Sequence, residues 1–263
     1  MDGLMAPGPG MGPGLGAAAW LVAGVAALGI GVAKSGLPGV SLLHVVLFAH
    51  LFPGLRSTGV VLPMLLVGDL GAVLMFRREA RWEHVLRTLP PAVVGVASGW
   101  GCMRAWPRLD WNPVLGGIVL ALALMQVARN MRPEWWSRVP HGRVFAVSVG
   151  FVAGVTTMVA NAAGPVMALY LLAVSLPKDA FVGTAAWFFL AINALKLPFS
   201  AGLGLVDGGS LALNAVLAPA VVAGLFLGRW LTARIPQRGF DHLVLAFAIA
   251  ASAKFLLASA GLR

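Results

Sequence analysis

The chain has 263 residues, of which 59% are hydrophobic and only 11% are charged, and its formal net charge is +10. Soluble domains carry about 25% charged residues, so this composition excludes a soluble protein and predicts an all-α polytopic membrane protein. The single cysteine, Cys102, excludes a disulfide framework and a cysteine-rich metal site. The basic residues are mostly arginines in short connections, which is typical of membrane-protein loops rather than of a nucleic-acid-binding surface.

In chain order, the Gly- and Pro-rich residues 1–16 lack the basic start of a secretory signal and predict a flexible tail. Apolar segments then cover roughly 17–33, 38–52, 59–76, 89–105, 113–128, 143–160, 165–176, 182–203, 211–231 and 240–260. A full helical span takes about 20 apolar residues, but 38–52 and 165–176 are shorter. Because each follows a longer segment after only four residues, KSGL or NAAG, we predict two helices broken within the membrane.

The two broken segments belong to an internal duplication. KSGLP at 34–38 corresponds to NAAGP at 161–165, Gly59 to Gly183, Asp69 to Asn193, and PAVV at 91–94 to PAVV at 219–222. Chance gives single matches of this kind easily, but it rarely gives them in the same order. We therefore predict two repeats, 17–129 and 143–263, joined by an Arg- and Trp-rich cytoplasmic linker at 130–142.

The basic residues indicate how the repeats are oriented. If each broken pair crosses the membrane twice, the repeats are parallel and the connections share 16 basic residues nearly evenly, nine against seven. If each pair is instead a re-entrant hairpin followed by three spans, the repeats are inverted and the division is twelve against four. The positive-inside rule favours the inverted arrangement, which also predicts an extracellular C-terminus.

Inverted repeats with paired breaks are typical of secondary transporters, whose substrate site lies where the breaks meet. A helix that restarts at a break presents free backbone N–H groups and a partial positive charge, which attract anions. Pro38 and Pro165 suit the first position of such a helix, and Gly36 and Gly164 allow close backbone approach.

Two polar residues flank the breaks. Lys34 precedes the first break. Placing a lysine in the hydrocarbon core of a membrane costs about 2.5–3.5 kcal/mol, so we expect Lys34 to have a function there, namely to bind the anion. The alternative is that its side chain extends to the membrane–water interface. Asn161, at the matching position, offers hydrogen-bond donors and an acceptor. Its alternative role is a hydrogen bond between helices.

Asp69 is the only acidic residue in the core of a span, and we expect it to couple transport to a proton or to pair with a lysine. Its counterpart Asn193 shares a helix face with Lys196, so both are candidates for the site. A purely structural Lys196–Asp69 pair explains the pattern equally well.

The remaining candidates line or neighbour the predicted cavity. Trp187 lies deep enough to form part of its wall, and the hydroxyl of Tyr170 lies one turn after the second break. His44 and His50 follow the first break; we interpret them as satisfied or interfacial histidines, with a coupled proton step as the alternative. No nucleophile–base pair, metal-ligand set or nucleotide-binding motif occurs, so we predict no enzyme, cofactor or metal.

Three stretches resemble the repeat signatures of the sulfite exporter TauE/SafE family: GIGVAKSGLPG, STGVVLPMLLVGDLGAVL and residues 151–199, which begin FVAGVTTMVANAAGP. The resemblance implies a multi-pass inner-membrane carrier that exports sulfite, sulfoacetate or a related sulfonate. The family's motif positions correspond here to Lys34, Ser35, Gly36, Pro38, Asp69, Asn161, Gly164, Pro165, Gly183, Thr184, Asn193 and Lys196.

The sequence therefore predicts a secondary transporter whose partners are a small anionic substrate and membrane lipid, with no nucleic acid. Two other functions fit the same residues: a carrier for another small organic anion and a passive anion channel. A membrane-embedded enzyme or assembly factor is a third, which the lack of a catalytic set disfavours.

Overall fold

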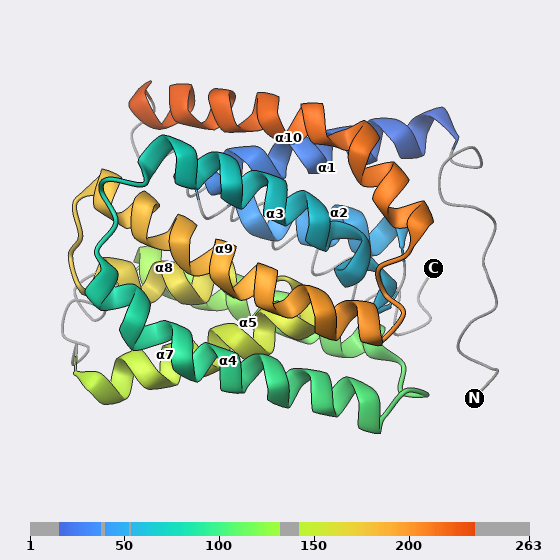
Figure 1. Cartoon of the computed structure of the whole chain (residues 1–263), viewed down its shortest axis with the longest axis horizontal. Coiled ribbons are helices and arrows are strands. Elements are labelled where there is room, and N and C mark those ends of the chain that lie inside the picture. The colour runs from blue at the N-terminus through green and yellow to red at the C-terminus, as the bar shows by residue number, and fades with distance from the viewer. Residues whose placement is uncertain (1–15, 38–39, 53, 132–141, 235–263) are drawn as a thin grey trace.

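The computed structural model describes residues 16–37, 40–52, 54–131 and 142–234, and these residues form helices and connections without a strand. The helices are α1 Ala17–Lys34, α2 Ser41–Leu51, α3 Arg56–Phe76, α4 Trp82–Ala105, α5 Trp111–Met131, α7 Arg143–Ala160, α8 Ala163–Ala173, α9 Lys178–Gly202 and α10 Gly208–Arg234 (Figure 1). The all-α prediction is therefore confirmed for this part of the chain. The predicted tail, most of the predicted linker and the last apolar segment lie outside it.

Five of the described helices, α1, α3, α7, α9 and α10, are long and apolar enough to cross a membrane. The predicted short segments are α2 and α8, with 11 residues each. One boundary differs from the prediction. The predicted apolar segment begins at residue 89, but α4 begins at Trp82. In its first turns Val85 and Thr88 are buried, while Glu83 and Arg87 are exposed and form an ion pair four residues apart.

Both predicted breaks are present. The first helix ends at Lys34, Gly36 has a φ of +118°, and α2 begins at Ser41. At the second break, Asn161 adopts the left-handed conformation that ends α7, with a φ of 52°, and α8 follows almost at once. Asparagine is one of the few side-chain-bearing residues that adopt this conformation readily.

The position of Pro165 at the second break differs from the prediction. Pro165 is the third residue of α8, not the first as predicted, because the helix begins at Ala163. The first four N–H groups of a helix have no intrahelical partner, so a proline at the third position costs no hydrogen bond. Pro38 lies outside the described residues.

Close contacts at glycines pack helices of the two halves of the chain against each other. α1 packs on α10, and a Cβ on Gly224 would lie 2.1 Å from the carbonyl oxygen of Leu28. α4 packs on α7, and a Cβ on Gly154 would lie 2.0 Å from the carbonyl oxygen of Ala92. Small residues let membrane helices approach this closely. Figure 1 shows these two pairs on opposite sides of the bundle, with α3 and α9 between them.

α3 and α9 pack against each other in opposite directions. A Cβ on Gly59, near the start of α3, would meet the carbonyl oxygen of Leu205, just after α9. A Cβ on Gly183, near the start of α9, would meet the carbonyl oxygen of Phe76 at the end of α3. Gly59 and Gly183 are the positions that the duplication aligns, and each contacts the far end of the other repeat's helix.

The apolar core has two main parts. One surrounds α8 and contains Met167, Leu171 and Phe188. The other joins α1, α2, α3 and α10 and contains Ile30 and Phe48. Helices of both halves contribute to each part, so neither half has a core of its own among the described residues.

We expect Gly154→Ala to destabilise the protein by about 1–3 kcal/mol, because the added methyl meets the backbone of α4, which cannot move without separating two helices. The control is Gly117→Ala in α5, where a Cβ meets nothing within 4 Å. Because alanine has the higher helix propensity, this control is expected to be neutral or stabilising. Thermal unfolding in detergent measures both; equal melting temperatures would contradict the close packing of α4 on α7.

Candidate functional site

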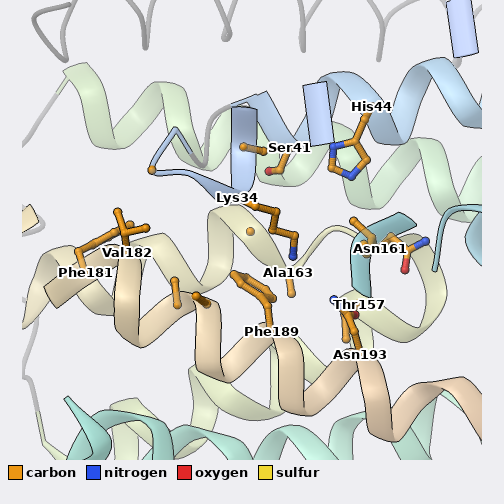
Figure 2. A pocket seen from close by; sticks show the side chains of 16 residues that line it. Lys34, Ser41, His44, Thr157, Asn161, Ala163, Phe181, Val182, Phe189 and Asn193 are labelled. Carbon is orange, nitrogen blue, oxygen red and sulfur yellow. The ribbon is translucent and has the colours of Figure 1, made fainter. Parts of the chain in front are cut away.

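A cavity joins the two breaks. It is lined by residues of α1, α2, α3, α7, α8, α9 and of the first break, and it comprises about 590 Å³ of space between side chains, part of it open to the surroundings (Figure 2). Its polar lining residues are Lys34, Ser41, His44, Thr157, Asn161 and Asn193. The rest of the lining is apolar or glycine. Four of them, Lys34, Asn193, Thr157 and Asn161, belong to two hydrogen-bonded groups.

The first group centres on Asp69, which is fully buried in α3. Its Oδ1 lies 2.6 Å from Lys34 Nζ, and Asn193 Nδ2 donates to its Oδ2 at 2.6 Å. The Lys34 ammonium also lies 4.2 Å from the ring centroid of Phe189, a cation–π distance. The Lys34 side chain is 10% exposed, and it is the part of this group that remains accessible from the cavity.

The second group centres on Lys196, which is 1% exposed. Its Nζ donates to the carbonyl oxygen of Thr157 at 2.9 Å, to Thr157 Oγ1 at 3.2 Å and to Asn161 Oδ1 at 2.5 Å. Asn161 Nδ2 donates to the carbonyl oxygen of Thr58 at 2.8 Å. An ammonium has three donors, and all three are used here. Lys196 therefore holds the second break in place and has no donor left for a ligand.

The charges of the two groups do not balance. Within them, Lys34 and Lys196 supply two cations and Asp69 supplies one anion. Uncompensated charge in a buried site is costly, so the cavity favours an additional negative charge. The start of α8 adds to this preference, because Ala163 and Gly164 line the cavity and are the first two residues of that helix.

Two polar groups at the cavity lack a protein partner among the described residues. His44 is 1% exposed and neither of its ring nitrogens is hydrogen-bonded; Asn193 Oδ1 is likewise unpartnered. Buried polar atoms nearly always have a partner, so these atoms are available to a ligand or to water. The prediction of a satisfied or interfacial His44 is therefore wrong, whereas His50 is exposed. Ser41 and His44, three positions apart on α2, both line the cavity, so these two polar residues mark the lining face of an otherwise apolar helix.

Several predicted site residues lie together. Lys34, Gly36, Asn161, Gly164 and Asn193 all line the cavity. Lys196 contacts Asn161 from behind, and Asp69 is bonded to Lys34.

Other predicted residues bond elsewhere. Ser35 Oγ donates to the carbonyl oxygens of its own helix, at Gly31 and Val32, and Thr184 Oγ1 accepts from the backbone N–H of Arg81. Pro165 is buried within α8 and is not among the lining residues.

The two predicted wall residues also lie away from the cavity. The hydroxyl of Tyr170 is hydrogen-bonded to Nδ1 of His84 at 2.9 Å, and Trp187 packs on Trp82 with ring centroids 5.0 Å apart. The aromatic lining comes instead from Phe181 and Phe189, which precede and follow Trp187 on α9. In the described part of the chain, no cluster of three His, Cys, Asp or Glu residues could hold a metal ion.

Comparison with known proteins gives this geometry a context. A sequence model described as "Sulfite exporter TauE/SafE" matches residues 14–255, nearly the whole chain. The chain belongs to the TauE/SafE family. It is therefore a multi-pass membrane transporter of the sulfur-anion exporter type. Searches of curated proteins and of solved structures found no match.

In this TauE/SafE protein the Lys34–Asp69 pair can be tested by a double-mutant cycle. Lys34→Met leaves a buried carboxylate without its cation, and we expect it to lower the free energy of unfolding by about 3–5 kcal/mol. Adding Asp69→Asn is expected to restore most of this loss, because the asparagine oxygen still accepts from Asn193. Chemical or thermal unfolding of the four proteins measures the coupling; additive effects would show that the two residues do not interact.

Proposed function

We propose that the protein is a secondary transporter that exports a small sulfur-containing anion, such as sulfite, sulfoacetate or a related sulfonate, across the inner membrane. The anion binds near the membrane midplane, between the two helix breaks. The observation that carries this proposal is the cavity itself, which joins both breaks and has Lys34 in its lining. The buried Asp69 and Lys196 lie behind the lining, bonded to Lys34 and Asn161 respectively. Membership in the TauE/SafE family supports the class of anion.

Lys34 is the residue that binds the anionic group directly. Its ammonium reaches the cavity, and Asp69 occupies only part of its bonding capacity. An incoming anion shares Lys34 with this carboxylate and is further stabilised by the first turn of α8. Lys196 acts through Asn161, because its own donors are all used within the protein. It is a positioning residue.

The substrate site lies between two inverted repeats in this proposal. The antiparallel contact of α3 and α9, which the duplication aligns, supports that orientation. So does the hydrogen bond from the backbone of Arg81 to Thr184, which holds the α3–α4 connection against the start of α9. Both segments then lie on the cytoplasmic side, where the positive-inside rule places the basic residues.

Labelling of single cysteines tests the orientation. In a Cys102→Ser background, Arg78→Cys and Asp179→Cys are expected to be protected from a membrane-impermeant maleimide in intact cells, and Arg108→Cys is expected to react. All three positions are exposed. Parallel repeats would place Asp179 with Arg108, so reaction of Asp179→Cys in intact cells would contradict the inverted arrangement.

Export from loaded proteoliposomes tests the function. We expect saturable efflux of sulfite or sulfoacetate from vesicles with the wild-type protein. Asp69→Asn keeps Lys34 and is expected to retain anion binding, whereas Lys34→Gln/Asp69→Asn loses a charge-assisted hydrogen bond. The double variant is therefore expected to raise KM by roughly 10- to 150-fold. The matched control is Lys178→Gln, which removes an exposed lysine outside the cavity.

The form of the flux separates the proposal from its rivals. Saturation, together with dependence on an imposed ion gradient or membrane potential, identifies a carrier; flux that rises linearly with concentration identifies a channel. Transport of carboxylates but of no sulfur anion would refute the proposed substrate class. An unchanged KM in Lys34→Gln/Asp69→Asn would remove Lys34 from the site.

A further inference from the structure

The stripe of α9 that lines the cavity is partly exposed over most of its length. The lining residues on this helix are Phe181, Val182, Ala185, Ala186, Phe189 and Asn193. Phe181, Ala185 and Phe189 lie at every fourth position and are half-buried, whereas Asn193, the next residue of this row, is 1% exposed. Figure 2 shows Phe181 and Asn193 on opposite sides of Lys34. The cavity therefore extends from the two breaks toward the start of α9.

The matching stripe of α3 is buried throughout. Since the duplication aligns Gly59 with Gly183, the six lining positions of α9 have counterparts in α3. These counterparts are Ser57, Thr58, Val61, Leu62, Leu65 and Asp69, and none of them is more than 5% exposed. α3 runs opposite to α9, so its start lies at the other end of the bundle (Figure 1). The cavity is therefore open toward one end of the bundle and closed toward the other.

Asn161 makes the closure at the start of α3. Its Nδ2 donates to the carbonyl oxygen of Thr58 at 2.8 Å, which bonds the second break to the first turn of α3. Lys196 Nζ donates to the Oδ1 of the same side chain at 2.5 Å. α7, the helix that ends at this break, also packs on α3. These contacts hold the second break against α3 and separate the cavity from that end of the bundle.

The first break leaves the matching contact open. The duplication aligns Lys34 with Asn161 and Val182 with Thr58. Both Lys34 and Val182 border the cavity, so its space lies where the counterpart of the Asn161–Thr58 contact would form. The Lys34 ammonium is instead bonded to Asp69, a residue of its own repeat, at 2.6 Å. The two breaks therefore differ in the contact that controls access, although their positions in the repeats are the same.

We propose that Asn161 is the gate of the transport path and that this structure is the state open toward the start of α9. In the opposite state the second break separates from Thr58 and opens the α3 end, while Lys34 moves against the start of α9 at Val182. The glycine contacts that join α3 to α9 at both ends are kept in both states. The inference rests on the proposed function, because a carrier exposes its site to each side in turn.

Two cysteines at aligned positions report on the two ends of the path. Ala185→Cys in α9 and Val61→Cys in α3 are made in the full-length Cys102→Ser protein and treated with a charged, membrane-impermeant methanethiosulfonate, in intact cells and in inside-out vesicles. Ala185→Cys is expected to react from the side that labels Arg78→Cys, which follows the end of α3. Val61→Cys is expected to react at least about tenfold more slowly, because water reaches it only in the minor state.

Asn161→Asp is expected to open the closed end. An aspartate keeps an oxygen for Lys196 but has no donor for the carbonyl oxygen of Thr58. Losing a hydrogen bond that exists in only one of the two states is expected to raise the labelling rate of Val61→Cys by roughly 2- to 13-fold. The added labelling is expected from the side that labels Arg108→Cys.

A second variant and a control keep this test decisive. Asn161→Gly removes the side chain, and glycine readily adopts the left-handed backbone that Asn161 has, with a φ of 52°. It is expected to raise the Val61→Cys rate as well. The control is Asn214→Ala. Asn214 Nδ2 donates to the carbonyl oxygen of Val60 at 2.8 Å but lies on α10, which belongs to neither break, so this variant is expected to leave the rate unchanged.

Each outcome decides the inference. Val61→Cys that reacts as fast as Ala185→Cys in the parent protein overturns the one-sided closure. If neither Asn161 variant raises the Val61→Cys rate, or if Asn214→Ala raises it equally, Asn161 is not the gate. Faster labelling in the Asn161 variants alone supports the inference. The labelling needs no substrate, so this pattern together with a lack of sulfur-anion efflux would refute the proposed function and leave the gate in place.

Discussion

The structure depends on one buried carboxylate. Asp69 is fully buried, and it connects the first break to α9, since it binds Lys34 on one oxygen and Asn193 on the other. A lysine at membrane depth costs about 2.5–3.5 kcal/mol, and this protein has two at one cavity. Asp69 neutralises only one charge, while Lys196 is stabilised by neutral oxygens. The remaining positive charge is the basis of the proposed anion site.

The Asp69 carboxylate also lies at the contact between the two halves of the chain. Asp69 and Asn193 are aligned by the duplication, and they are hydrogen-bonded to each other. Lys34 and Asn161 are also aligned, but each belongs to a different polar group. At these two matched positions of the predicted duplication, the first half carries Lys34 and Asp69 and the second half carries Asn161 and Asn193.

Close glycine contacts make this arrangement rigid. α1 packs on α10 and α4 packs on α7 with their backbones in close contact. Each of these pairs joins a helix of the first half to a helix of the second half. Hydrophobic burial contributes little between membrane helices, since lipid tails are as apolar as the side chains, and close van der Waals packing takes its place. This packing fixes α3 and α9 at the centre and with them the distance between the two breaks.

The sequence by itself determined the class of protein, the two breaks and most of the charged site. These conclusions depend on local properties: the composition, the short segments after KSGL and NAAG, and the rarity of charge in apolar runs. The same properties identified Lys34, Asp69, Asn161 and Lys196. Only the tertiary structure decided which partner each residue takes. Ser35 and Thr184 bond to nearby backbone instead of the cavity, and His44 and Phe189 line it. In a helix that is apolar on almost every side, periodicity alone does not mark the face that turns inward, so that choice depends on packing between segments far apart in the chain.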